Sequence, residues 1–236
     1  MLGSIRRIVK HRLAALLGDV IRDIIDRDSS RQLFDILNER QRIALNTTAH
    51  YVAREMRHAD VLEDRSRLLR FALAKVTQSG LYLEFGVATG TTVNLIAAAT
   101  PSHVYGFDSF AGLPEAWPGY LPKGAFRQEQ LPVVRENVEL VVGLFEDTLP
   151  PFLLEHPDPV AFLHIDCDLY SSTKTVLDHL GPRIRSGSII LFDEYFNYPG
   201  WEEGEHRAFT EFVAARSVSY TYLAYTNSQQ VAVRIN

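Results

Sequence analysis

The sequence predicts an α/β fold in which a mostly parallel β-sheet is covered by helices and follows a helical segment. After Gly80, short runs rich in β-branched and aromatic residues alternate with helical segments, which is typical of parallel strands joined by crossover helices. Residues 5–76 instead carry apolar residues at helical spacing. The last two β-rich runs are joined by a short segment around Asn227, which predicts an antiparallel hairpin.

The amino-terminal part, residues 1–79, is predicted to be a helical lid or oligomerisation segment. Its apolar residues include Ile21, Ile24, Ile25, Leu33, Leu37, Leu68 and Leu69. The basic residues at its start are Arg6, Arg7, Lys10 and Arg12. They either bind an anionic membrane surface or form the solvated face of a helix that caps the core or joins two copies. The second interpretation is favoured and predicts a homodimer.

The core, residues 80–236, is predicted to contain seven strands. They span residues 81–85, 104–108, 138–142, 160–166, 188–193, 219–225 and 230–235. The first five are separated by segments long enough for crossover connections, so they are expected to run parallel. The segment 112–123 holds three prolines and two glycines and is therefore predicted to be a loop beside the second strand.

Composition narrows the class of protein. Of the 236 residues, 46% are hydrophobic and 22% are charged, which predicts a folded globular chain. The net charge of -5 argues against a nucleic-acid partner, because a phosphate backbone requires a basic surface. A single cysteine, Cys167, leaves no internal disulfide and agrees with a reducing, cytoplasmic location. No apolar run approaches the roughly 18 residues of a membrane span, so membrane insertion is not expected.

The first strand of the core leads into a loop of small residues. This loop and the start of the next helix comprise Glu84, Gly86, Ala88, Thr89, Gly90 and Thr91. Glycines permit a positive φ and a close approach of the backbone, and the free N–H groups of a helix start attract anionic groups. The segment therefore predicts a nucleotide-like ligand, with an unliganded tight turn as the alternative. The glycine spacing differs from the dinucleotide fingerprint, which disfavours NAD.

Two further strand ends complete the predicted nucleotide site. Asp108 ends the second strand, where its carboxylate can accept hydrogen bonds from ribose hydroxyls, and Ser109 follows it. Phe145 and Glu146 follow the third strand, where an adenine could stack or form hydrogen bonds. The alternative is that the polar residues of this last segment only cap a turn.

An acidic cluster is expected where the fourth and fifth strands end. Asp166 and Asp168 close the fourth, and Asp193 and Glu194 close the fifth. Carboxylates brought together in this way repel one another unless a cation lies between them. We therefore predict a Mg²⁺ site formed by Asp166, Asp193 and Glu194, with positions left for water or two neighbouring substrate hydroxyls. Asp168 is a less favoured ligand, since it precedes a helix that it could cap.

The segment 195–207 follows the fifth strand and is dense in aromatic and polar residues. Tyr195 and Trp201 are the candidate contacts to an acceptor, because flat aromatic faces pack against sugar rings or other rings. His206 and its neighbours instead fit the start of a helix that ends near Ala215.

Taken together, these motifs resemble the macrocin O-methyltransferase (TylF-like) family of sugar methyltransferases from antibiotic pathways. The resemblance covers about residues 80–236. It is carried by the segments 84–90, 107–114, 143–150, 165–173 and 193–195. Two positions depart from the family: Cys167 stands where glycine is usual, and Glu194 replaces a common aspartate.

The resemblance implies a Rossmann-like class I methyltransferase fold and an enzyme of natural product biosynthesis. It implies that residues 84–90, Asp108 and Ser109 hold S-adenosyl-L-methionine, and that the acidic cluster binds Mg²⁺. It also makes Asp166 the candidate general base. The sequence therefore predicts a metal-dependent O-methyltransferase that acts on a hydroxyl of a carbohydrate or glycosylated small molecule.

Three other functions fit parts of the pattern. A catechol-type methyltransferase would use the same sheet and metal with an aromatic diol. The Asp166-x-Asp168 spacing also occurs in metal-dependent glycosyltransferases that bind nucleotide sugars, although the glycine loop and terminal hairpin argue against this class. A non-catalytic adenosine-binding module would not require the acidic cluster.

Overall fold

The computed structural model describes residues 35–236, and the predicted basic start of the chain lies outside them. Contacts divide the chain into two compact units, residues 1–43 and 44–236. Helix α2 (Ile36–Glu55) begins in the first unit and continues into the second. The second unit contains the whole sheet and the candidate site.

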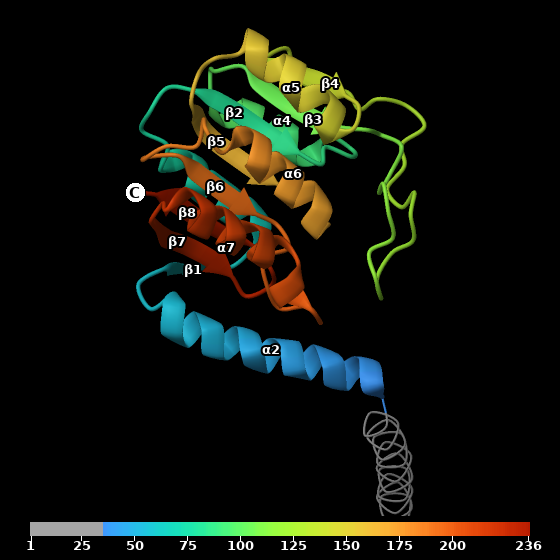
Figure 1. Ribbon diagram of the computed structural model, residues 1–236, viewed down its shortest axis with the longest axis vertical. Helices are drawn as coiled ribbons and strands as arrows, with labels where there is room; N and C mark the ends of the chain where they lie inside the picture. The colour runs from blue at the N-terminus through green and yellow to red at the C-terminus, as the bar shows by residue number, and fades with distance from the viewer. Residues whose placement is uncertain (1–34) are drawn as a thin grey trace, which may run out of the picture. The chain divides into compact units, whose positions relative to one another are not determined.

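One eight-stranded sheet organises the second unit (Figure 1). In chain order its strands are β1 (Asp60–Leu62), β2 (Leu81–Phe85), β3 (Val104–Asp108), β4 (Val138–Val142), β5 (Val160–Ile165), β6 (Ile189–Phe192), β7 (Tyr220–Thr226) and β8 (Val231–Ile235). Their order across the sheet is β1-β7-β8-β6-β5-β2-β3-β4. Strand β8 runs antiparallel to both neighbours, and the other pairs are parallel. The predicted α/β fold, its mostly parallel sheet and its terminal hairpin are confirmed.

Strand β1 was not predicted from the sequence. Strand β1 is three residues long, and two of these residues are exposed, so it shows neither alternation nor a buried apolar run. It pairs in parallel with β7, with Val61 opposite Tyr225. Its place in the sheet is therefore set by the neighbouring strand rather than by a local sequence pattern.

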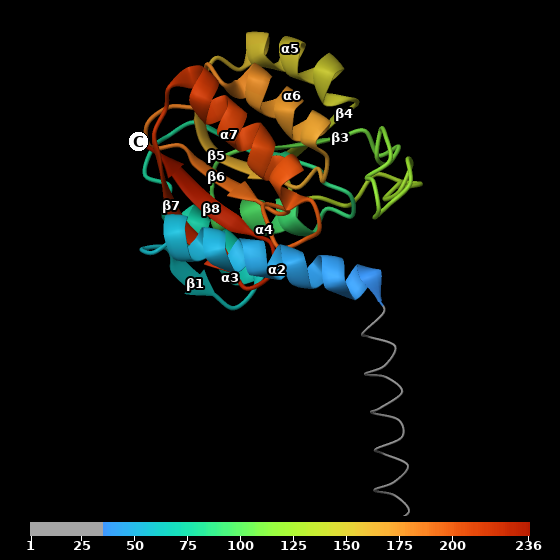
Figure 2. The same cartoon turned by 60° about the horizontal axis from the view of Figure 1, so that its bottom comes forward.

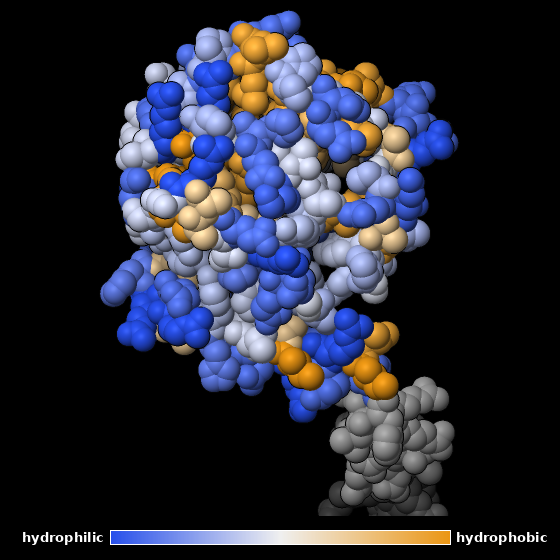
Figure 3. Space-filling model, viewed as in Figure 1, coloured by the Kyte–Doolittle hydropathy of each residue, from blue (hydrophilic) through white to orange (hydrophobic). Residues whose placement is uncertain are grey.

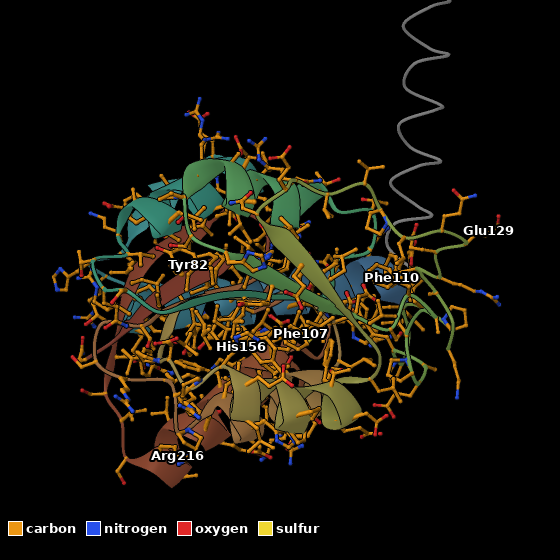
Figure 4. All side chains as sticks on the ribbon, turned by 90° about the horizontal axis from the view of Figure 1, so that it is seen from above. Tyr82, Phe107, Phe110, Glu129, His156 and Arg216 are labelled. Carbon is orange, nitrogen blue, oxygen red and sulfur yellow. The ribbon has the colours of Figure 1, made fainter. Side chains whose placement is uncertain are left out.

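Helices cover both faces of the sheet (Figure 2). On one face lie α3 (Arg65–Ala74) and α4 (Thr91–Ala99), and on the other lie α5 (Phe145–Glu155), α6 (Tyr170–Leu180) and α7 (Glu205–Arg216). A short 3-10 helix, η1 (Trp201–Glu203), precedes α7. Two apolar layers fill the space between sheet and helices. Figure 4 shows Phe107 and His156 in the layer beside α5, whereas Glu129 lies at the outer edge, on the long connection from β3 to β4.

Helix α3 belongs to the core, although the sequence placed it in the segment 1–79. Its residues Leu68, Leu69 and Ala72 are fully buried against the sheet. It lies within the second compact unit, which begins at Ala44. None of the described helices is long and apolar enough to cross a membrane, and polar residues cover most of the face seen in Figure 3.

The parallel strands place several polar residues at one edge of the sheet. Strands β6, β5, β2 and β3 are consecutive in the sheet and run in the same direction. The residues that follow these strands therefore lie together at the carboxyl edge of the sheet. This edge is where open α/β sheets bind ligands. Strand β5 is buried along its whole length, which fixes the position of the acidic segment that follows it.

Candidate active site

A cavity of about 510 Å³ opens at the carboxyl edge of the sheet, within the size range of small-molecule sites. Of the predicted site residues, those that line it are Gly86, Ala88, Asp108, Ser109, Phe145, Glu146, Asp166, Asp193 and Glu194. The predicted nucleotide site and the predicted metal site therefore form two parts of one cavity.

The loop after β2 approaches the end of β5 very closely. Gly86 has φ +92°, and a Cβ built there would lie 1.7 Å from the backbone oxygen of Asp166. Only glycine leaves room for this crossing and adopts this φ without strain. The crossing holds the backbone of the glycine loop against the backbone of a predicted metal ligand.

Asp108 holds the same loop from the other side. Its Oδ2 accepts hydrogen bonds from the backbone N–H groups of Val87 at 2.9 Å and Ala88 at 2.8 Å. Its Oδ1 accepts one from the N–H of Phe110 at 2.7 Å. A carboxylate offers about four acceptor positions, so these bonds leave room for a ribose hydroxyl. Asp108 thus shapes the loop in addition to facing the cavity.

Four predicted cofactor residues do not line the cavity in the described part of the chain: Glu84, Thr89, Gly90 and Thr91. Glu84 is fully buried, with Oε1 3.0 Å from Nδ1 of His164. Burial by itself lowers the pKa of His164, but the hydrogen bond and charge of Glu84 raise it overall. Gly90 immediately precedes α4, at its N-cap position, with φ 80°. Glu84 thus supports the loop from within the fold, whereas Thr89 and Thr91 are exposed, with their Oγ1 atoms 3.1 Å apart.

The predicted metal ligands form a compact cluster. Carboxylate oxygens of Asp166, Asp193 and Glu194 lie within 4.8 Å of one another. Burial, reinforced by the charge of Asp193, raises the pKa of Asp166 to about 7. The same two causes raise the pKa of Glu194 well above its usual value. Buried carboxylates this close together favour either a proton or a cation between them.

Two more carboxylates lie beside this cluster. Asp168 lines the cavity and has φ 62°. It does not cap α6, whose N-cap is Leu169, and burial followed by the charge of Asp193 raises its pKa to about 7. Glu205 is fully buried and accepts a hydrogen bond from the N–H of Glu194 at 3.0 Å. Glu205 therefore fixes the backbone of a predicted ligand, a role that its place at a helix start did not reveal.

Arg65 is the main residue of the site that sequence reasoning missed. It is the first residue of α3, and its guanidinium forms ion pairs with Asp166 and Asp193. The arginine is 101 positions away from Asp166 in the chain, and no local pattern distinguishes it from the neighbouring Arg67 and Arg70. Only the packing of α3 on the sheet reveals it.

Tyr195 and Trp201, predicted to contact an acceptor, lie in the apolar core instead. Tyr195 is fully buried, and its hydroxyl lies 2.6 Å from that of Tyr222. Trp201 is 3% exposed, and its Nε1 donates to Oγ1 of Thr47 at 3.0 Å. The ring of Trp201 packs against that of Tyr51, and the ring of Tyr195 packs against that of His206. Burial of such large aromatic surfaces is strongly favourable. Neither lines the cavity.

Other residues form the outer wall of the cavity. Phe126, on the connection from β3 to β4, lines it and is 53% exposed. The hydroxyl side chains Ser171, Ser172 and Thr175 of α6 also line it, together with Glu115. Ser171 donates from Oγ to Glu115 at 2.5 Å. One aromatic face and several hydroxyls suit an acceptor that has both a flat apolar surface and polar groups.

Residues 83–195 match a family model that is described as a methyltransferase domain. Demethyldecarbamoylnovobiocin O-methyltransferase of Streptomyces niveus is 36% identical over 75 residues, or 31% of this chain and 28% of that protein. The 8-demethyl-8-(2,3-dimethoxy-alpha-L-rhamnosyl)-tetracenomycin-C 4'-O-methyltransferase of Streptomyces olivaceus is 33% identical over 67 residues, or 28% of this chain and 24% of that protein. The matched stretch thus spans about a quarter of these two relatives.

Solved structures extend the similarity over most of the chain. The calicheamicin methyltransferase CalS11 superposes with a TM-score of 0.58 and 25% identity over 72% of this chain and 76% of that chain. An apo structure of CalS11, described as a TDP-rhamnose 3'-O-methyltransferase, gives a TM-score of 0.51 and 27% identity over the same shares. The fold is therefore that of the class I, Rossmann-like methyltransferases.

Proposed function

We propose that the protein is an O-methyltransferase that transfers a methyl group from S-adenosylmethionine to a sugar hydroxyl, with Mg²⁺ at the acidic cluster. The observation that carries this proposal is the single cavity that joins the loop held by Asp108 to the cluster of Asp166, Asp193 and Glu194. The methyltransferase domain match over residues 83–195 and the similarity to antibiotic O-methyltransferases support it.

The cofactor would occupy the part of the cavity beneath the glycine loop. Gly86 and Ala88 bring the backbone close to the ligand, Asp108 accepts from a ribose hydroxyl, and Phe145 with Glu146 contacts the adenine. These residues share the cavity with the acidic cluster, whose negative charge favours a ligand that carries a positive charge.

The donor set fits a hard divalent cation. Three carboxylates converge, and Oε2 of Glu194 is buried without a hydrogen-bond partner among the described residues. Oxygen ligands of this kind suit Mg²⁺. When bound, the ion would stabilise negative charge on an acceptor oxygen and orient neighbouring hydroxyls.

The protein's own residues would position the acceptor and move its proton. When bound, S-adenosylmethionine would supply a methyl group on a positively charged sulfur, and transfer of this group to the acceptor oxygen would break the carbon–sulfur bond and leave S-adenosylhomocysteine. Asp166 accepts the hydroxyl proton. Phe126 and the hydroxyls of α6 would hold the ring of the acceptor.

The charge of the cavity favours an acceptor without phosphate groups. Its carboxylates are Asp108, Glu115, Glu146, Asp166, Asp168, Asp193 and Glu194. Arg65 is the one cationic side chain among the described lining residues. A diphosphate would be repelled by this lining more strongly than a neutral glycoside. We therefore place the acceptor with glycosylated small molecules rather than with nucleotide sugars, in line with the rhamnosyl group in the name of the Streptomyces olivaceus relative.

A turnover assay tests this function. The full chain is incubated with S-adenosylmethionine and MgCl₂ together with an aryl rhamnoside, TDP-rhamnose or catechol, and S-adenosylhomocysteine and methylated products are measured by mass spectrometry. Methylation of the rhamnoside is expected. Asp166→Asn should lose turnover, whereas the control Asp158→Asn, at an exposed position, should keep it. Full turnover of Asp166→Asn would contradict the base assignment. Preference for TDP-rhamnose or catechol would contradict the acceptor class.

A further inference from the structure

A guanidinium lies inside the proposed metal site. Arg65 pairs with the carboxylate of Asp166, and its Nε lies 2.7 Å from Oδ1 of Asp193. Both carboxylates belong to the proposed ligand set. The guanidinium donates a hydrogen bond to Oδ2 of Asp166, whereas its contact with Oδ1 of Asp193 is an ion pair without a hydrogen bond. Burial lowers the pKa of Arg65, but the charges of Asp166, Asp193 and Glu194 raise it overall.

This arrangement has two consequences for a divalent cation. A cation that binds Oδ2 of Asp166 must compete with the N–H donor of Arg65 for a lone pair of that oxygen. A positive charge that stays nearby repels the ion even if it does not block it. Both effects act in the same direction, so Arg65 weakens metal binding whether it is displaced or remains.

The side chain has a route out of the site. The side chain of Arg65 is 39% exposed, and its long flexible stem lets the guanidinium turn toward solvent. The backbone of Arg65 can remain in place during this movement, because Asp64 caps α3 by accepting a hydrogen bond from the N–H of Arg67 at 2.8 Å. Helix α3 is also anchored to the sheet through Leu68 and Leu69.

We propose that Arg65 is an internal counter-ion that holds Asp166 and Asp193 together when no divalent cation is bound. Its guanidinium gives way when the cation binds, and this competition lowers the affinity of the site for the cation. This inference rests on the proposed function, since it concerns the same metal site. It contrasts with a supporting role, in which Arg65 would orient the carboxylates for the ion and its removal would weaken binding.

The test measures Mg²⁺ binding by calorimetry on the purified full chain without cofactor or acceptor. Arg65→Gln is expected to bind Mg²⁺ about tenfold more tightly than the wild type, the effect of one nearby charge in a partly exposed site. Arg65→Lys keeps the charge and is expected to bind close to the wild type. Arg67→Gln removes the same charge two residues further along α3, where Arg67 pairs with Glu63 at 2.8 Å, and is expected to leave Mg²⁺ binding unchanged.

Thermal unfolding gives a second readout. Without metal, Arg65→Gln is expected to melt below the wild type, because the carboxylates lose their counter-ion. It is also expected to gain more in melting temperature on addition of Mg²⁺. Unchanged or weaker Mg²⁺ binding by Arg65→Gln would overturn the inference.

Asp193→Asn separates this inference from the proposed function. If Asp193→Asn abolishes Mg²⁺ binding but the Arg65 variants bind as the wild type does, only the role of Arg65 is wrong. If the wild type and Arg65→Gln both fail to bind Mg²⁺, or if Asp193→Asn binds it normally, the metal site and the inference are both wrong. Binding by Arg65→Gln but not by the wild type would support the inference.

Discussion

Replacing Gly86 with alanine is expected to disturb both parts of the cavity at once. The new Cβ would lie 1.7 Å from the backbone oxygen of Asp166, whereas real Cβ atoms stay at least 3.0 Å from such neighbours. One of the two backbones must therefore move. Because Gly86 and Asp166 both line the cavity, this movement displaces the cofactor loop, a proposed metal ligand, or both.

The magnitude follows from two contributions. A side chain at φ +92° costs about 1–2 kcal/mol of strain. The displacement also weakens the hydrogen bonds from Gly86 N–H to Phe107 and from Asp166 N–H to Phe85, both 2.9 Å long, at about 1 kcal/mol each. Gly86→Ala should thus lower the free energy of unfolding by about 3–4 kcal/mol.

Gly200→Ala is the matched control. Gly200 has φ +87°, yet a Cβ there would meet nothing within 4 Å. It should lose only the strain contribution, about 1–2 kcal/mol. Urea unfolding gives the free energies, and calorimetric titration of S-adenosylmethionine reports the site. Equal losses of stability in the two variants, within about 0.5 kcal/mol, together with unchanged cofactor binding in Gly86→Ala, would refute the close-approach argument.

Three further changes have distinct expected results. Asp108→Asn sets an NH₂ group against backbone donors, so it should cost about 1–3 kcal/mol in urea unfolding and weaken S-adenosylmethionine binding in calorimetry; wild-type values for both would contradict the role of Asp108. Burial lowers the pKa of His206 to about 4, so the unfolded chain takes up a proton near pH 6.5 that the folded chain refuses. Stability should therefore be fully present above pH 6.5 and fall as pH drops toward 4, and His206→Phe should reduce this loss in unfolding experiments at several pH values; an unchanged slope would contradict it. Phe126→Ala should raise KM for a glycoside acceptor with little change in stability, whereas an unchanged KM in steady-state assays would remove Phe126 from the acceptor site.

The sheet was accessible from sequence because its strands carry strong local signals. Strand β5 is buried throughout and reads as a short apolar run between polar boundaries. The residues after β2, β3 and β5 could then be placed at one edge, because parallel strands end on the same side. This reasoning brought Asp108 and Asp166 to one cavity without knowledge of their distance.

The missed features depend on contacts that leave no local pattern. The position of Arg65 is set by the packing of α3, and β1 exists through its pairing with β7. For Tyr195 and Trp201 the aromatic composition was ambiguous, because a ring that faces a substrate and a ring that fills a core look the same in sequence. Burial among other aromatic rings decided the outcome.

Binding of S-adenosylmethionine to the isolated full chain is the most direct test of the central claim. Calorimetry of the wild type and Asp108→Ala, with NAD and a nucleotide sugar as comparison ligands, requires no knowledge of the acceptor. We expect one binding site for S-adenosylmethionine in the wild type, and its loss or strong weakening in Asp108→Ala. Absence of binding by the folded wild type, with NAD or the nucleotide sugar bound instead, would contradict it.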